Sequence, residues 1–275
     1  MIESYRNQIN EAVDFIRSKT NIKPDFGMIL GSGLGELADE IENKVVIPYK
    51  EIPNFSVSTA PSHAGNLILG QLSGKNVMVM QGRVHAYEGY TPKEVTLPVR
   101  VMKALGVHTL INTCATGGLN RNFKAGDLML ITDHVNLSGM NPLTGANDPE
   151  MGERFPVMFD AYNPKLRELA KSVAMENQIY LQEGVYLGIA GPVFFTRAEL
   201  RHAIQIGADA IGMSIVQEVI AAIHGGMKVL GIGTITDMAL PDTEHHATEK
   251  EVLDTAKRTG PVFRKLLKSI LSKIE

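Results

Sequence analysis

The chain has 275 residues, of which 44% are hydrophobic and 21% charged, and its formal net charge is −3 at pH 7. This composition matches a globular protein with a large core and does not indicate a disordered chain. Because there is no basic excess, broad binding to nucleic acid or to an anionic membrane is not expected, and any anion must be held by a local site.

The predicted elements alternate between helices and buried strands. Apolar residues at spacings of three and four predict a helix over 2–17, and the short run FGMIL, which ends in a glycine turn, predicts a strand at 26–30. Further strands are expected at 66–72, 76–80, 108–113, 127–131, 184–190 and 227–235, with helices at 92–105, 163–177, 196–206, 214–225 and 247–273.

This alternation is typical of an α/β protein whose sheet is buried under helices on both faces. We predict one α/β domain over residues 1–275, with a twisted, mixed and largely parallel central sheet flanked by helices. Ligand sites in such sheets lie beyond the carboxyl ends of the strands. The segment 133–162 has no regular period, and a loop of that length is usually functional.

Several loops that follow strands carry groups suited to an anion. GSGLG at 31–35 offers backbone amides and the Ser32 hydroxyl, although a tight glycine turn alone explains it better. It lacks the GxGxxG dinucleotide fingerprint, and no Walker lysine follows. Arg83 and His85 alternate onto one side of an extended segment and suit an oxyanion, but a surface arginine and a structural histidine are equally common.

Three further positions are ambiguous on their own. His63 in SHAG is ordinarily a capping or core histidine. Cys114 lies in a loop of small residues, TCATGGLN, where a buried structural cysteine is commoner than a nucleophile. Ser214 stands at a strand-to-helix junction, where helix capping alone would explain it.

Together these segments resemble, in order and spacing, the trimeric purine nucleoside phosphorylases of the nucleoside phosphorylase family. The resemblance covers nearly the whole chain. The motifs that carry it are LGSGLG, SHAG, GRVHAYEGY, GGLN, GDLMLITDH, NPLTGANDPEMGERFP, AGP, GADAIGMS and EVIAA.

The resemblance implies phosphate-dependent cleavage of purine nucleosides, with His85 and Asp237 as catalytic residues. Cys114 departs from the asparagine usual in the family. The phosphate ligands that the family pattern assigns here are Ser32, His63, Arg83, His85, Ala115 and Ser214.

For the sugar, the resemblance implies contacts from Tyr87 and Met213. It also implies that Phe155 reaches a neighbouring subunit's site, which requires a homotrimer. Glu249 stands where the family has a histidine near the sugar 5′-hydroxyl, and His245 or His246 could replace that histidine.

The base site departs further from the family pattern. Phe195, which follows Phe194, replaces a glutamate, and Asp237 replaces an asparagine that reads 6-oxopurines; both changes resemble methylthioadenosine phosphorylases. A desolvated Asp237 could hold a proton near neutral pH and donate it to N7 of the purine. We therefore expect a specificity relaxed or shifted toward 6-aminopurines such as adenosine.

No organic cofactor or metal is expected, because phosphate is a co-substrate and no metal-ligand spacing occurs. The single cysteine, a start without signal-peptide character and the lack of an apolar run of ~18 residues favour a cytoplasmic protein that binds no membrane. The alternatives are a methylthioadenosine phosphorylase, which Glu249 disfavours, a nucleoside hydrolase, and a non-catalytic purine-binding homologue.

Overall fold

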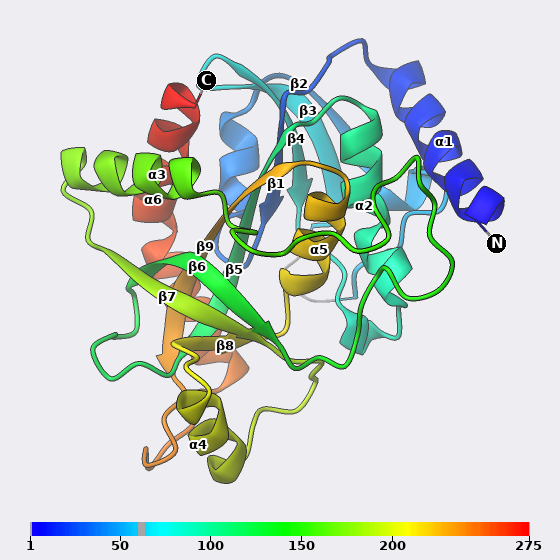
Figure 1. Cartoon of the computed structure of the whole chain (residues 1–275). Helices are drawn as coiled ribbons and strands as arrows, with labels where there is room; N and C mark the ends of the chain where they lie inside the picture. Colours follow the sequence, from blue (N-terminus) through cyan, green and yellow to red (C-terminus); the bar gives the residue numbers. More distant parts are fainter. Residues whose placement is uncertain (1, 60–63, 275) are drawn as a thin grey trace.

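This computed structural model describes residues 2–59 and 64–274, and the strands in those ranges form one mixed sheet with helices on both faces (Figure 1). The sheet order is β2-β3-β4-β1-β5-β8-β7-β6-β9. The strands are β1 (Phe26–Leu30), β2 (Glu42–Pro48), β3 (Asn66–Leu72), β4 (Lys75–Gln81), β5 (Thr109–Gly118), β6 (Leu128–Asn136), β7 (Leu181–Gly188), β8 (Ala210–Gly212) and β9 (Lys228–Met238).

Two helical layers cover the sheet, each over its own buried apolar cluster. On one side α1, α2 and α5 pack over a core that includes Ile16, Val99 and Val219. On the other side α3 and α6 pack over a core that includes Val173 and Phe263. The helices are α1 (Ile2–Lys19), α2 (Pro92–Ala104), α3 (Pro164–Glu176), α4 (Arg197–Gln205), α5 (Val216–His224) and α6 (Glu249–Lys273), with 3-10 turns η1 (Gly35–Glu40), η2 (Tyr49–Glu51) and η3 (Ala86–Glu88).

Part of the sheet closes on itself. β5 pairs with both β8 and β9, while β6 pairs with both β7 and β9, and β7 pairs with β8, so these five strands form a ring. The end of β5 carries two glycines: a Cβ on Gly118 would lie 2.8 Å from Met238 Sδ, and one on Gly117 would lie 3.0 Å from Ala239 Cβ. The glycines therefore let the strands pack closely where the ring closes.

The fold prediction is confirmed, and two strands were missed. All predicted helices are present with ends within two residues of those expected, and each predicted strand lies at or close to an observed one. β2 was missed because most of its residues are exposed, and β8 because it has only three residues. The irregular segment begins at residue 137 rather than 133, since β6 continues to Asn136.

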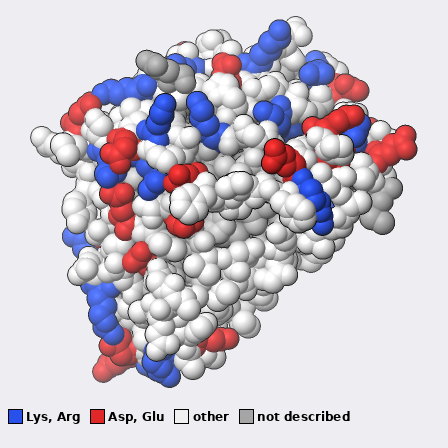
Figure 2. All heavy atoms as spheres, viewed as in Figure 1, with Lys and Arg blue, Asp and Glu red and all other residues white. Residues whose placement is uncertain are grey.

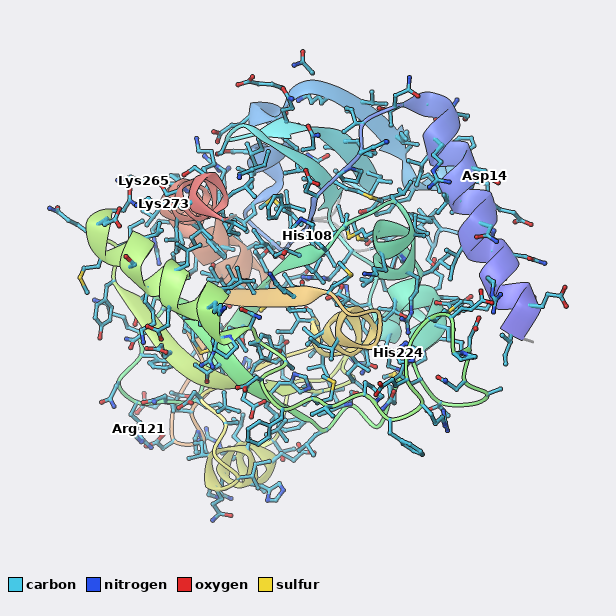
Figure 3. The ribbon with its side chains drawn as sticks, turned by 45° about the horizontal axis from the view of Figure 1, so that its top comes forward. Asp14, His108, Arg121, His224, Lys265 and Lys273 are labelled. Atoms are coloured by element: carbon cyan, nitrogen blue, oxygen red, sulfur yellow. The ribbon has the colours of Figure 1, made fainter. Side chains whose placement is uncertain are left out.

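Lys273 near the end of α6 pairs with Glu176 at the end of α3, and Figure 3 shows Lys273 beside both helices. None of the described helices is long and apolar enough to cross a membrane.

Candidate active site

A cavity of about 380 Å³ lies where β1, β5, β8 and β9 end, with the loop after β4 as a further wall. Residues from distant parts of the sequence meet there because the carboxyl ends of the parallel strands β1, β5 and β9 share one edge of the sheet, and the antiparallel strand β8 pairs with the end of β5. The predicted site residues in its wall are Ser32, Arg83, His85, Tyr87, Ala115, Phe194, Phe195, Met213, Ser214, Asp237 and Glu249.

Among the described residues, Phe155 is the predicted site residue that does not line the cavity. His63 lies outside the described residues. The Phe155 side chain is 82% exposed, and its ring lies 5.6 Å from the Arg154 guanidinium carbon. Its predicted role concerns a second chain and stays a prediction.

Arg83 lines the cavity and belongs to a buried polar network. Its Nε donates to Glu218 Oε1 at 2.9 Å and its Nη2 to Glu218 Oε2 at 3.2 Å, while Nη2 also donates to Asn112 and Nη1 to the Thr113 carbonyl. Arg83, Asn112 and Glu218 are each no more than 3% exposed. A surface arginine, the alternative left open by the sequence, is therefore wrong, and the guanidinium is held in one orientation.

The His85 imidazole is oriented by Glu88. The Glu88 carboxylate accepts from the His85 backbone N–H at 2.7 Å, lies 3.3 Å from His85 Nδ1, and accepts from the Thr59 hydroxyl at 2.7 Å. Burial would raise the pKa of Glu88, but the hydrogen bonds from His85 and Thr59 outweigh burial and lower it to about 2. On the other side of the imidazole ring, His85 Nε2 faces Ser214 Oγ at 3.5 Å.

Ser214 does not cap α5. The N-cap is Ile215, which has no side-chain capping bond, and the Ser214 backbone N–H donates to Tyr186 Oη at 3.1 Å. The Ser214 hydroxyl instead lines the cavity beside His85. The capping explanation for this serine is therefore wrong.

The glycine loop after β1 is shaped by its close neighbours and also faces the cavity. Gly33 has φ +82°, and a Cβ there would lie 2.4 Å from the Ala256 carbonyl oxygen on α6. The Gly31 N–H donates to Thr113 Oγ1 at 2.9 Å. The glycines therefore meet a structural need, while Ser32 between them lines the cavity.

The rest of the cavity wall is largely apolar and carries one half-buried acid, Asp237. Phe195 and Met213 pack against the apolar cluster around Leu200 and Ile211. Thr236 Oγ1 donates to Asp237 Oδ1 at 3.0 Å, and burial raises the pKa of Asp237 although this hydrogen bond opposes the change.

Glu249 and His246 also line the cavity. His246 lines the cavity with its ring 4.6 Å from that of Phe194, whereas His245 faces Glu251 at the surface. Of the two histidines that the sequence left open, His246 is the one in the cavity wall.

Burial, Glu88 and Glu249 together raise the pKa of Tyr87, which keeps its phenol protonated.

Comparison with known proteins identifies the family. A model described as the phosphorylase superfamily matches residues 25–272. Purine nucleoside phosphorylase 1 of Geobacillus stearothermophilus is 51% identical over 266 residues, which cover 97% of each chain. The chain belongs to the purine nucleoside phosphorylases. The corresponding protein of Bacillus subtilis (strain 168) is 49% identical over 98% of this chain and 100% of its own. The structure of Schistosoma mansoni purine nucleoside phosphorylase in complex with adenosine is similar with a TM-score of 0.94, at 40% identity over 98% of each chain.

In this phosphorylase Cys114 is not a nucleophile. The thiol is 2% exposed, and burial raises its pKa to about 12, so it stays protonated and unreactive at neutral pH. The neighbouring Ala115 lines the cavity.

The sequence prediction did not assign roles to Glu218, Asn112 or Glu88, which hold the predicted phosphorylase residues in place. One signal was available for Glu218, because it is the single carboxylate in the mostly apolar helix α5. A buried carboxylate requires a cationic partner.

Among the described residues, no group of three or more His, Cys, Asp or Glu side chains is arranged to hold a metal ion.

Proposed function

We propose that this chain, acting as one domain over residues 1–275, cleaves purine ribonucleosides or deoxyribonucleosides with inorganic phosphate. The products are the free purine and the sugar 1-phosphate, as purine salvage requires. One observation carries the proposal: a single cavity is lined by two groups of residues. Ser32, Arg83 and Ser214 suit phosphate, and Phe195 with the acid Asp237 suits the purine. Phosphate is a co-substrate, and the reaction needs no organic cofactor or metal.

Phosphate is held by Ser32, Arg83, His85, Ser214, His63 and the backbone at Ala115. Glu218 and Asn112 fix the Arg83 guanidinium before phosphate binds, so little reorganisation is needed when charge shifts in the transition state. A phosphate oxygen then bonds to the anomeric carbon as the bond from that carbon to purine N9 breaks. The electron pair of the broken bond moves onto the purine.

Asp237 accounts for the departure of the purine. Negative charge grows near N7 as the glycosidic bond breaks, and a protonated carboxyl group can donate its proton there. The raised pKa of Asp237 favours the protonated form. His85 contributes at the other end by contacting phosphate through Nε2.

The base site favours 6-aminopurines or accepts both purine classes. Phe195 gives a 6-oxopurine no partner for its N1 hydrogen, and an unmatched buried polar group costs about 1–3 kcal/mol. The structure of the Schistosoma mansoni protein contains adenosine, so a relative's site admits a 6-aminopurine.

The sugar lies between Tyr87, Met213 and Glu249, and Phe155 closes the sugar site of a neighbouring subunit in a cytoplasmic homotrimer. Phe155, Val157 and Phe159 are 82%, 73% and 88% exposed in the single chain. The segment that contains these three residues crosses the front of the molecule in Figure 1. On the same face, Figure 2 shows a broad area with few Lys, Arg, Asp or Glu side chains. An apolar strip on such a face fits burial against another subunit.

The test is cleavage of inosine, guanosine, adenosine and methylthioadenosine with and without phosphate. We expect phosphate-dependent cleavage, substantial adenosine turnover, and slow cleavage of methylthioadenosine because the Glu249 carboxylate meets a thioether poorly. Strong inosine preference with little adenosine turnover would contradict the specificity shift. Cleavage without phosphate identifies a hydrolase, best turnover of methylthioadenosine identifies that phosphorylase, and binding without turnover identifies a non-catalytic homologue.

A further inference from the structure

Ile215, between Ser214 and α5, has an unusual backbone conformation, with φ +57° and ψ −40°. The Val216 N–H donates to the Ser214 carbonyl at 2.7 Å, spanning Ile215 alone. A bond of this kind around a residue of positive φ defines the rarer, strained form of the γ-turn. For a β-branched residue such as isoleucine, a positive φ is a genuine outlier that costs free energy.

The surroundings of this turn hold it in place. The Ile215 side chain is 1% exposed and belongs to the core cluster under α5. Before the turn, a Cβ on Gly212 would lie 2.4 Å from Tyr186 Oη, the atom that accepts the Ser214 N–H. After the turn, a Cβ on Gly188 would lie 2.5 Å from Val216 Cγ2. Burial of the isoleucine and this close packing offset the strain.

The turn decides what the Ser214 hydroxyl does. At an ordinary strand-to-helix junction a serine serves as N-cap, and its hydroxyl accepts from the first turn of its own helix. Here the γ-turn places Ile215 at the N-cap, so the Ser214 hydroxyl is left in the cavity, 3.5 Å from His85 Nε2.

We propose that Ile215 is a positioning residue for phosphate binding, whose buried side chain anchors a strained γ-turn that directs the Ser214 hydroxyl into the cavity. This inference rests on the proposed function, in which Ser214 binds phosphate. Ile215 does not line the main cavity and acts only through its neighbour.

Substitutions at Ile215 can separate the effect of its buried side chain, the anchor, from the effect of the backbone strain at positive φ. Ile215→Ala removes the anchor but keeps a Cβ and therefore the penalty of positive φ, so the turn relaxes and the serine moves. Ile215→Gly removes the anchor and the penalty together, because glycine adopts positive φ readily. Ile215→Val keeps both, since it retains the branched side chain.

The experiment measures KM for phosphate, KM for the best nucleoside substrate, and phosphate binding by calorimetry, in the full-length wild type and the three variants. We expect Ile215→Ala to raise the phosphate KM about tenfold, Ile215→Gly about threefold, and Ile215→Val hardly at all, with the nucleoside KM unchanged. Tyr186→Phe removes only the hydroxyl that accepts the Ser214 N–H, and it should raise the phosphate KM about threefold even if the alanine variant does not fold.

Several results would overturn the inference. A glycine variant impaired as much as the alanine variant would assign the effect to lost side-chain volume alone. Equal rises in both KM values would show general damage, and unchanged phosphate affinity in Ile215→Ala or in Tyr186→Phe would show that the turn does not position the serine. A wild type that binds no phosphate would refute the proposed function and this inference with it, whereas wild-type binding without the expected order of variants refutes the inference alone.

Discussion

The two ends of the cavity are built in different ways. At the phosphate end, Arg83 is buried with Glu218 and Asn112 in the core of the sheet. At the base end, Phe194 is 56% exposed and lies in the segment before α4, beside His246 from the segment before α6. The proposed anion site is therefore built by buried residues, whereas the proposed base site combines Asp237 at the end of β9 with side chains from the segments before α4 and α6.

The largest effect is expected from Arg83→Ala. Removing the guanidinium leaves the Glu218 carboxylate buried without its cation, so the free energy of unfolding should fall by about 3–5 kcal/mol. The loss of a preorganised donor should lower kcat/KM for phosphate by about 10³-fold. Urea unfolding and steady-state kinetics measure the two effects.

Arg121→Ala is the matched control for this substitution. Arg121 pairs with Asp242 at the surface, where both side chains are more than 60% exposed, and it lies at the edge of the molecule near α4 in Figure 3. We expect this variant to lose less than about 1 kcal/mol and to keep its activity. Equal losses in the two variants would contradict the difference between core and periphery.

Asp237→Asn is expected to lower kcat for adenosine by about 10²-fold, because an amide cannot act as the proton donor to N7. Binding of phosphate should be unchanged, since Asp237 belongs to the base end. Asp242→Asn, a change of the same kind at the surface, is the control. Adenosine cleavage retained at the wild-type rate in Asp237→Asn would remove Asp237 from the mechanism.

The pH dependence follows from the raised pKa of Asp237. In the proposed mechanism the protonated carboxyl is the active form, so kcat for adenosine should fall as pH rises through that pKa, and Asp237→Asn should lose this limb of the profile. Because ionisation of a carboxyl with a raised pKa opposes folding, the asparagine variant should also be the more stable protein above the ordinary pKa of aspartate. A wild-type adenosine profile that rises over this range would contradict the assignment.

Phe195→Glu restores a carboxylate at the base end and should shift the ratio of inosine to adenosine turnover by about tenfold toward inosine, through one new hydrogen bond to a 6-oxopurine. Phe195→Leu keeps the site apolar and should leave the ratio near the wild-type value. The same ratio in both variants would show that this position does not contact the base.

The smallest effect is expected from Glu88→Gln, which weakens the hydrogen bonds to His85 and Thr59 and should cost about 1 kcal/mol at pH 7. Since the pKa of Glu88 is lowered from 4.5 to about 2, its stabilisation is fully present above pH 4.5 and is lost as the pH falls toward 2. The difference between wild type and variant in acid unfolding should therefore vanish at low pH. Glu3→Gln on the exposed face of α1 is the control, and a difference that persists at pH 2 would contradict the assignment.

The sequence predicts those parts of the molecule whose signals lie within one short segment of the chain. The buried strands were found because each is a short apolar run, and the amphipathic helices because each has a helical period. Most residues of β2 are exposed, and β8 has only three residues. The residues of the phosphate end were found at strand ends, where short motifs mark them. The Arg83–Glu218 pair joins residues 135 apart, so the position of Glu218 in an apolar helix marks a buried carboxylate but does not show its partner. The γ-turn at Ile215 depends on packing from several elements and has no local signal.

The most direct test of the account is a crystal structure with inorganic phosphate and a purine nucleoside analogue. We predict one phosphate ion within hydrogen-bonding distance of Ser32, Arg83, His85 and Ser214, with the purine next to Phe195 and Asp237. Phosphate bound anywhere else, with these four side chains directed away from it, would contradict the account.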